Sequence, residues 1–454
     1  MHVSELRKDA LGFLHSLALG IAGTAPSFSI SATMATLIAT VGLLAPASLL
    51  YCGLMMFGIT VAYAKLNSVK SSAGAAYTWL GEIFSPAWGF FSGWAVLCSS
   101  ALFMVSATVP AGAATLLILK PELANDKVAV TLVSIFWLAL VSVGVMMGAL
   151  FSGRAMMITA SFEMLTLAVL GIATLVSGVA VNPLSWHDLS PFAFTLPSFA
   201  SGAVIAVFFY WGWDVALNFS EETKDSTRNP GRGALAAAIL LMIAFVVAAA
   251  TCVTVLSDTE VADSGTTILF SVANKVLPQP WGYVAVLALM LSTIGTLQTS
   301  IAQFARMMFA KSRDGVLPPR WGQLHPKWQT PKAAIMLIAG LGTLLLLLSL
   351  ASESLADTMQ ASINAIGAQA AFYYGLTGIA CAWHCVKEGA SGWRDWLIFV
   401  AWPLASAITL IIAAIITLQT AGPVTNIFAI GGIALGAIPW WLWGRASPTV
   451  SLES

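Results

Sequence analysis

The fold is decided by residues 13–42, which read FLHSLALGIAGTAPSFSISATMATLIATVG. This run exceeds the roughly 20 apolar residues that a helix needs to cross a bilayer. Its middle, GIAGTAPS at 20–27, places small residues, a Thr and a Pro where a simple span would carry Leu and Val. Pro26 lacks an N–H and suits the first turn of a new helix. The sequence therefore predicts two half-helices, one ending near Ala22 and one beginning near Pro26. A proline kink with close helix packing is the structural alternative.

Similar apolar runs follow along the whole chain of 454 residues. We identify twelve candidate spans, at about 13–42, 45–66, 87–118, 128–150, 155–178, 199–221, 234–256, 281–310, 332–351, 356–385, 395–418 and 425–444. The runs are continuous rather than alternating, so they indicate helices and not barrel strands. The sequence therefore predicts an all-α integral membrane protein with 12 transmembrane helices, and membrane lipid as its surroundings.

Composition excludes several classes of protein. Only 9% of the residues are charged and 58% are hydrophobic, whereas soluble proteins are roughly 25% charged. The 20 Lys and Arg balance the 20 Asp and Glu, which argues against nucleic acid as a partner, because nucleic acid requires a basic surface. No G-x-x-x-x-G-K-[ST] loop is present, which argues against nucleotide-driven pumping.

The distribution of basic residues predicts the orientation in the membrane. With both termini inside, 17 of the 20 Lys and Arg fall in cytoplasmic segments, and only Lys120, Lys127 and Lys275 lie outside. Cytoplasmic loops carry such an excess of positive charge. We therefore expect a multi-pass protein of the cell inner (cytoplasmic) membrane, with cytoplasmic N- and C-termini. The sequence specifies no oligomeric state.

The sixth span is also interrupted, at FFYWGWD in 208–214. Gly212 breaks an aromatic run there, and Asp214 follows at membrane depth, where a carboxylate costs several kcal/mol unless it is paired or hydrated. Substrate contact or gating is the functional interpretation of Asp214. A hydrogen bond to a neighbouring helix is the structural one.

The positions of the two breaks indicate a repeat, because spans one and six each begin a set of five. Matching interruptions in two halves are typical of inverted-repeat transporters with a midplane site. We therefore predict a first repeat at 1–180, a second at 181–390, and two extra C-terminal helices with a tail at 391–454.

The chemistry of the breaks suggests a ligand. Amide dipoles at the first break, including the freed N–H groups of Ser27 and Phe28, suit a carboxylate. Open carbonyls at the end of the first half of span six, near 208–210, suit an ammonium group. Together the breaks predict a site for an α-amino acid.

Several further motifs occur in a fixed order along the chain. They are SAGAAY at 72–77, GFFSGW at 89–94, FYWGWD at 209–214, EETK at 221–224, NP at 229–230, RMMFAKSRDGVLP at 306–318, HP at 325–326 and TP at 330–331. With the broken first span, they make the chain resemble the amino acid–polyamine–organocation superfamily, and specifically its bacterial amino acid permeases. The resemblance covers nearly the whole length.

The resemblance implies a five-plus-five inverted repeat with discontinuous helices one and six, and secondary transport by alternating access. It also implies substrate contacts, which we expect at Ile21, Gly23, Thr24 and Ala25 for the carboxylate, and at Phe208, Tyr210, Trp211 and Gly212 for the ammonium and the pocket. Many members read Gly-Ser-Gly where this chain reads Gly23-Thr24-Ala25. The sequence is therefore also compatible with a bulkier or non-standard substrate.

Two buried acids, Glu163 and Asp214, are candidates for coupling and gating. Loss of water favours the neutral form of a carboxyl group, which can then carry a proton. Some proton-coupled relatives place a Lys in span five, at or near the position of Glu163. We expect a proton as the coupling ion and sodium less so, with hydroxyls of Thr293 and Thr296 nearby. The structural alternatives are a protonated Glu163 bonded to a span-one carbonyl, and ordinary interhelical bonds for the two threonines.

The remaining charges receive structural interpretations. We expect Glu221 and Glu222 to join a solvated salt-bridge network or a gate latch, and 311–332 to form a basic cytoplasmic loop. Cys381, His384 and Cys385 share a helix end but have no fourth ligand nearby in sequence, so we expect no metal site. We expect no cofactor.

The function predicted from the sequence is proton-coupled import or exchange of amino acids. A polyamine or monoamine transporter of the same fold is the alternative, with Asp214 pairing a substrate cation. A membrane enzyme is remote, because neither H-E-x-x-H nor G-x-S-x-G occurs. A channel or a non-transporting sensor of the same fold is a further alternative, which substrate counterflow separates from a carrier.

Overall fold

The structure is a computed structural model that describes residues 5–352, 354–390 and 392–444. The two chain ends lie outside these residues. Arg445, one of the 17 basic residues assigned to cytoplasmic segments, also lies outside them. Within the described residues the chain is helical, without a sheet. One isolated parallel bridge pairs Leu11 with Thr223.

The first half of the chain holds seven α-helices. They are α1 (Phe13–Thr24), α2 (Pro26–Val41), α3 (Ala45–Val69), α4 (Ala76–Ile83), α5 (Pro86–Leu119), α6 (Lys127–Met146) and α7 (Ala149–Ser177).

The second half begins with α8 and continues to the C-terminal region. Its helices are α8 (Leu196–Phe209), α9 (Val215–Asn218), α10 (Asn229–Val255), α11 (Asp258–Ser264), α12 (Ile268–Val276), α13 (Tyr283–Arg313), α14 (Lys332–Ser349), α15 (Leu355–Lys387), α16 (Trp393–Trp396), α17 (Trp402–Thr420), α18 (Pro423–Asn426), α19 (Gly432–Leu435) and α20 (Ala437–Trp443).

Short 3-10 turns and two π-helical segments connect these helices. The 3-10 turns are η1 (Gly42–Leu44), η2 (Pro121–Leu123), η3 (Trp186–Leu189), η4 (Pro191–Ala193), η5 (Ser220–Glu222), η6 (Gly265–Thr267) and η7 (Pro319–Gly322), and the π segments are η8 (Leu397–Ala401) and η9 (Ile427–Gly431).

Nine helical stretches of the described chain are long and apolar enough to cross a membrane. One of them, Phe13–Val69, contains the first two apolar runs of the sequence, and the shorter apolar helix Pro197–Phe209 lies in the sixth run. The all-helical membrane class predicted from the sequence is therefore confirmed. The helices α4, α11 and α12 were not predicted, because they are too short to produce an apolar run of spanning length.

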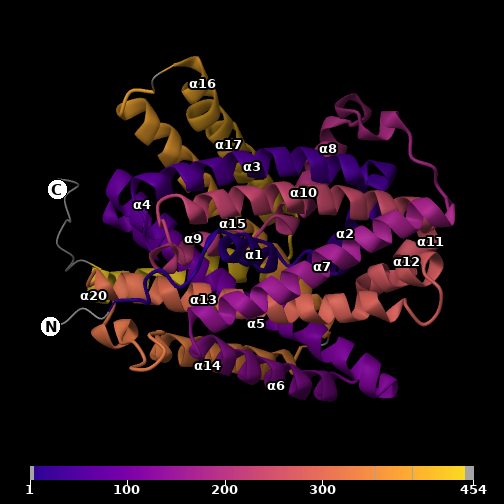
Figure 1. Cartoon of the computed structure of the whole chain (residues 1–454), viewed down its shortest axis with the longest axis horizontal. Helices are drawn as coiled ribbons and strands as arrows, with labels where there is room; N and C mark the ends of the chain where they lie inside the picture. The colour runs from indigo at the N-terminus through magenta and orange to yellow at the C-terminus, as the bar shows by residue number, and fades with distance from the viewer. Residues whose placement is uncertain (1–4, 353, 391, 445–454) are drawn as a thin grey trace.

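The helix α1 lies at the centre of the bundle (Figure 1). It packs against α7, α10 and α13. Figure 1 shows α3 and α10 running along one side of it, and α5, α13, α14 and α6 on the other. The first break is thereby enclosed by protein, which is where unwound backbone at membrane depth is tolerated.

Both predicted breaks are present. The α1 helix ends at Thr24, two residues later than expected, and α2 begins at Pro26. Ala25 between them has φ 51° and ψ 68°, a left-handed conformation that ends a helix. In the sixth span α8 ends at Phe209 and the short α9 begins at Val215, with Gly212 at φ 106° between them.

One charge prediction is wrong. The sequence places Lys311 in a cytoplasmic loop, but α13 continues to Arg313 and Lys311 is completely buried. Its ammonium lies 4.1 Å from the centre of the Phe90 ring and donates to the Phe90 carbonyl at 2.8 Å. These contacts replace water around the cation, which the topological rule does not anticipate.

Candidate functional site

The two breaks meet backbone to backbone in the core. A Cβ atom on Gly23 would collide with the Gly212 carbonyl oxygen, and a Cβ on Gly212 would collide with the Gly23 carbonyl oxygen. The approach is possible because both residues lack a side chain. The Gly23 carbonyl also accepts a hydrogen bond from Thr296 Oγ1 of α13 at 2.9 Å. Two of the expected contact residues, Gly23 and Gly212, therefore form the contact between the two breaks. We call this contact the crossing.

The donors of the first break are already engaged within the protein. The Ala25 N–H donates to the Ile21 carbonyl at 3.0 Å, and the Thr24 hydroxyl donates to the Gly20 carbonyl at 3.1 Å. The Ser27 N–H points to Glu163 Oε2 at 3.5 Å, and the Phe28 N–H donates to Ser292 Oγ at 3.1 Å. The amides expected to hold a substrate carboxylate are thus occupied in this conformation.

Glu163 of α7 is completely buried beside the start of α2. Ser292 of α13 donates its hydroxyl to Glu163 Oε2 at 2.7 Å, so one carboxyl oxygen receives both a hydroxyl and an amide. The other oxygen, Oε1, has no hydrogen-bond partner among the described residues. Glu163 therefore faces a helix N-terminus, which favours negative charge. This differs from the expected bond to a span-one carbonyl.

The two predicted threonines behave differently. Thr296 bridges α13 to the first break through the Gly23 carbonyl, whereas Thr293 donates within its own helix, to the carbonyls of Leu289 and Met290. Ser292, one residue before Thr293, is the hydroxyl that reaches Glu163. Positions 292 and 296 are four apart and share a helix face. This spacing could have identified Ser292 from the sequence.

Four aromatic side chains, which we call the aromatic cluster, lie beside the crossing: Phe28, Phe103, Phe208 and Trp211. The Phe28 ring lies 5.7 Å from Phe103 and 6.2 Å from Phe208, and Phe103 lies 5.0 Å from Trp211, all edge to face. Phe103 comes from α5 and was not predicted, because its position depends on the packing of a distant helix. The expected contact Tyr210 is directed elsewhere. Its hydroxyl donates to the Leu49 carbonyl of α3 at 2.6 Å.

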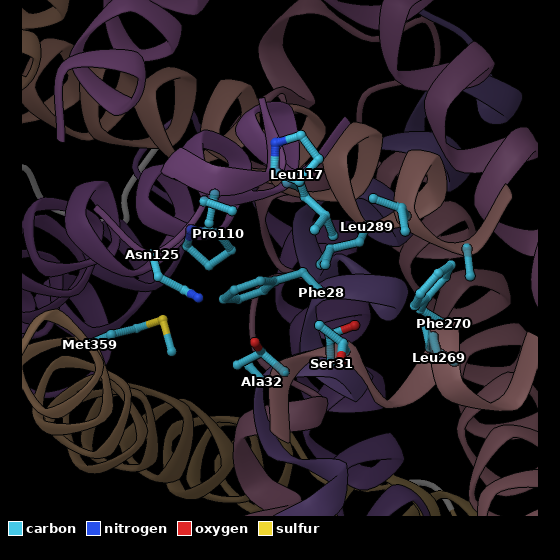
Figure 2. Close-up of a pocket in the computed structure, with 18 residues that line it drawn as sticks. Phe28, Ser31, Ala32, Pro110, Leu117, Asn125, Leu269, Phe270, Leu289 and Met359 are labelled. Atoms are coloured by element: carbon cyan, nitrogen blue, oxygen red, sulfur yellow. The ribbon is translucent and has the colours of Figure 1, made fainter. Parts of the chain in front are cut away.

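Two cavities each reach one residue of the aromatic cluster. One, of about 300 Å³, is lined by Phe28 together with residues such as Pro110, Asn125 and Leu289. Figure 2 shows the Phe28 ring at the centre of these residues. The other, of about 360 Å³, is lined by Phe208 and by α2, α15 and α17. Because Phe28 and Phe208 touch, they form an aromatic partition where the cavities approach the breaks.

Asp214 lies on the other side of the crossing and is 3% exposed. Its Oδ1 accepts the Tyr374 hydroxyl at 2.6 Å, and its Oδ2 accepts the Gln303 side-chain amide at 2.9 Å. The Tyr374 oxygen also accepts the Gly212 N–H at 3.2 Å. Asp214 is therefore linked to the second break through a tyrosine. Tyr374 and Gln303 were missed, since their sequence surroundings are ordinary apolar helix.

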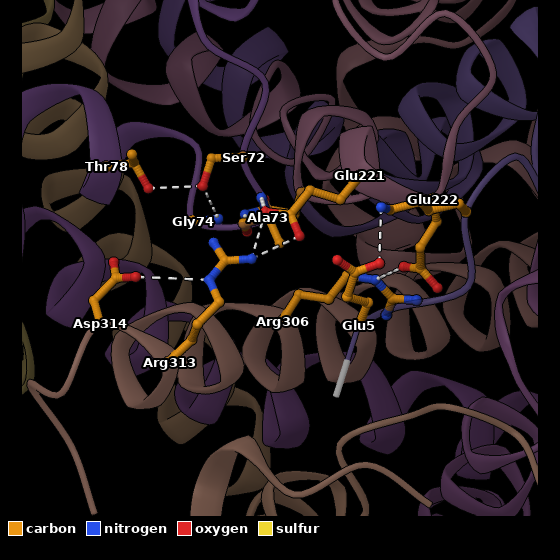
Figure 3. Close-up of polar contacts among 12 residues, drawn as sticks. Glu5, Ser72, Ala73, Gly74, Thr78, Glu221, Glu222, Arg306, Arg313 and Asp314 are labelled. Carbon is orange, nitrogen blue, oxygen red and sulfur yellow. Dashed lines mark hydrogen bonds and ion pairs between the residues drawn. The ribbon is translucent and has the colours of Figure 1, made fainter. Parts of the chain in front are cut away.

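A polar network joins the end of the broken sixth span to α13 (Figure 3). Arg306 and Glu222 form an ion pair at 2.5 Å, with side chains 2% and 1% exposed. The Arg306 guanidinium also lies 3.5 Å from the centre of the Phe219 ring. Closer to the surface, Arg313 pairs with Glu221 at 2.8 Å. The latch interpretation of these acids matches the geometry, but Glu222 is buried rather than solvated.

The N-terminal segment and the loop before α4 close over this network. Leu11 exchanges backbone hydrogen bonds with Glu222 and Lys224, at 3.0 and 2.9 Å. The Ala73 N–H donates to Glu221 at 2.8 Å, and Asn218 donates its side-chain amide to the Ala73 carbonyl at 2.8 Å. The breaks are thus sealed by hydrogen-bonded protein on this side, while the two cavities lie on the other.

Comparison with known proteins is consistent with this geometry. Residues 11–443 match the family model described as amino acid permease. The low-affinity putrescine importer PlaP of Escherichia coli (strain K12) is 28% identical over 369 residues, which cover 77% of this chain and 75% of that protein. The branched-chain amino acid permease BcaP of Lactococcus lactis is 24% identical over 305 residues, covering 62% of this chain and 63% of the relative.

Proposed function

Because the chain belongs to the amino acid permease family, we propose that it is a secondary transporter that moves amino acids or polyamines across the cytoplasmic membrane by alternating access. As a member of that family it is a multi-pass permease and not an enzyme. The relatives named above are a putrescine importer and a branched-chain amino acid permease, and both fall within this substrate range.

The observation that carries the proposal is the crossing of Gly23 and Gly212. Two interrupted helices that meet inside the bundle are the arrangement from which inverted-repeat transporters build their binding site for a small solute. We assign the repeats to 1–180 and 181–390, with 391–454 as an addition, and take the helices as 12 spans with cytoplasmic termini. In this orientation the Arg306–Glu222 network is the cytoplasmic gate, and it is closed.

The proposed coupling ion is a proton bound at Glu163. Its Oε1 is buried and has no hydrogen-bond partner in the described chain, and none of the ion pairs found there includes Glu163. A bare carboxylate in such surroundings is costly, and a proton removes that cost. Since Ser27 belongs to α2 and Ser292 to α13, protonation would weaken a contact that joins these two helices.

The test is uptake into liposomes that contain the purified protein. Radiolabelled amino acids and amines are offered with an inward proton gradient, and then in counterflow with the same solute loaded inside. A carrier accumulates label in both formats, whereas a channel gives no counterflow. If none of the amino acids and amines tested shows counterflow, the transport proposal is refuted.

A further inference from the structure

We propose, building on the transport function above, that Glu163 occupies the place of a substrate carboxylate at the start of α2 and thereby selects amines that carry no carboxylate. When Glu163 has released its proton, its carboxylate fills the anion position, and the crossing then recognises a cation. Glu163 acts in this proposal as a specificity-determining residue.

The first support is the absence of an open backbone donor among the described residues of the first break. Pro26 has no N–H, and the N–H groups of Ala25, Ser27, Phe28 and Ser29 all have acceptors. An incoming carboxylate would have to displace Glu163 from Ser27. That exchange returns one desolvated carboxylate to a buried position without partners, which is strongly unfavourable.

The second support is how Glu163 is held. Ser292 accepts the Phe28 N–H and donates its own hydroxyl to Glu163 Oε2, at 3.1 and 2.7 Å. The first two amides available at the α2 N-terminus are thereby joined to one carboxyl group, directly through Ser27 and indirectly through Ser292. A carboxylate at a helix N-terminus is the usual occupant of such a site.

The third support is the balance of acceptors and donors around the crossing. Glu163 Oε1 is an unpartnered acceptor, and Asp214 adds a second buried carboxyl group. Neither belongs to an ion pair of the described residues. The aromatic cluster supplies ring faces that attract cations. An ammonium group complements the unpartnered oxygen of Glu163 and the aromatic rings, whereas a zwitterion would bring a further carboxylate close to Glu163.

The test uses pairs of probes that differ only by the carboxylate: putrescine against ornithine, and isopentylamine against leucine. Equilibrium binding of each probe to the full-length protein in detergent is measured at neutral pH. We expect the wild-type protein to bind at least one amine ten-fold or more tightly than its amino acid partner. Equal or tighter binding of the amino acid in both pairs would overturn the inference.

Substitution at Glu163 gives the sharper result. Glu163→Ala frees the Ser27 N–H and the Ser292 hydroxyl, so the affinity for the amino acid of the preferred pair should rise ten-fold or more. Should Glu163→Ala fail to fold, Glu163→Gln removes the charge and should raise that affinity by a smaller factor. No gain in the folded variant would contradict the proposal. The matched control is Glu260→Gln, which removes the carboxylate of an exposed ion pair with Lys275. It should leave the affinities for the amine and for the amino acid unchanged.

Counterflow with wild-type protein separates this inference from the proposed function. If none of the four probes is exchanged, and none of the other amino acids and amines tested is exchanged either, the transport proposal itself fails. If ornithine or leucine is exchanged in preference to its amine, transport stands and only the role of Glu163 as an anion-site occupant is refuted.

Discussion

Gly23 and Gly212 lie so close that a side chain on either one would collide with the carbonyl oxygen of the other. These residues are 189 positions apart: Gly23 lies in the last turn of α1, next to the first break, and Gly212 lies within the second break. The contact makes the two breaks one structural unit. Each also makes a hydrogen bond with another helix: the Gly23 carbonyl accepts from the Thr296 hydroxyl, and the Gly212 N–H donates to the Tyr374 oxygen.

Replacing either glycine should separate the breaks. Gly23→Ala and Gly212→Ala each force a methyl group into backbone, and such overpacking costs about 1–3 kcal/mol, with further strain at Gly212 because of its positive φ. We expect a lower unfolding temperature and loss of solute binding. Gly340→Ala on α14 is the control, since no atom lies within 4 Å of the position that its new methyl group would occupy. Equal unfolding temperatures for the three variants would contradict the crossing.

Thr296 and Thr293 should differ in their effect on stability. Thr296→Val leaves the Gly23 carbonyl without its donor and should cost about 1–2 kcal/mol. Thr293→Val removes only a bond to the preceding turn of its own helix, so we expect a change below about 0.5 kcal/mol. Chemical unfolding of the purified variants measures both values. A larger loss for Thr293→Val would remove Thr296 from its bridging role.

The buried gate pair should be sensitive to the loss of one partner. Arg306→Ala leaves the Glu222 carboxylate without its cation in the core, and breaking such a pair typically costs about 3–5 kcal/mol. Arg313→Ala removes a partly exposed pair, with side chains 28% and 23% exposed, and should cost about 1 kcal/mol or less. The unfolding free energies of the two variants provide the comparison. Similar values would show that Arg306 is not a buried lock.

Glu163→Gln should uncouple transport from the proton gradient. The amide cannot take up and release a proton, but its carbonyl can still accept the Ser27 N–H. We therefore expect proton-driven accumulation to fall to the level set by exchange, while counterflow continues. Uptake at several pH gradients in liposomes is the measurement. Accumulation that still follows the gradient would exclude Glu163 as the proton carrier.

The breaks were predictable from the sequence because proline and glycine act locally. Pro26 removes a hydrogen bond wherever it lies, and Gly212 interrupts an aromatic run in any context. The partners of the site depend instead on packing between distant helices. Tyr374 and Gln303 are ordinary polar residues of apolar helices, and only the fold brings them to Asp214, whereas Ser292 could have been found from its four-residue spacing to Thr296.

Exposure was also hard to infer from charge alone. Lys311 and Glu222 lie near helix ends, where the sequence predicted solvated charges. In the structure an aromatic ring and a carbonyl surround Lys311, and Arg306 neutralises Glu222. Such burial follows from long-range contacts with α5 and α13, which no local pattern records.

The two breaks together are proposed to bind the transported solute, and this is the central claim. The most direct test is an experimental map of the protein with the probe that most raises its unfolding temperature. We predict density for the ammonium group against the backbone of 208–212 and beside Phe208 or Trp211, with Glu163 still at Ser27. Density for the probe only in the cavities away from the breaks, or on the membrane-facing surface, would contradict the claim.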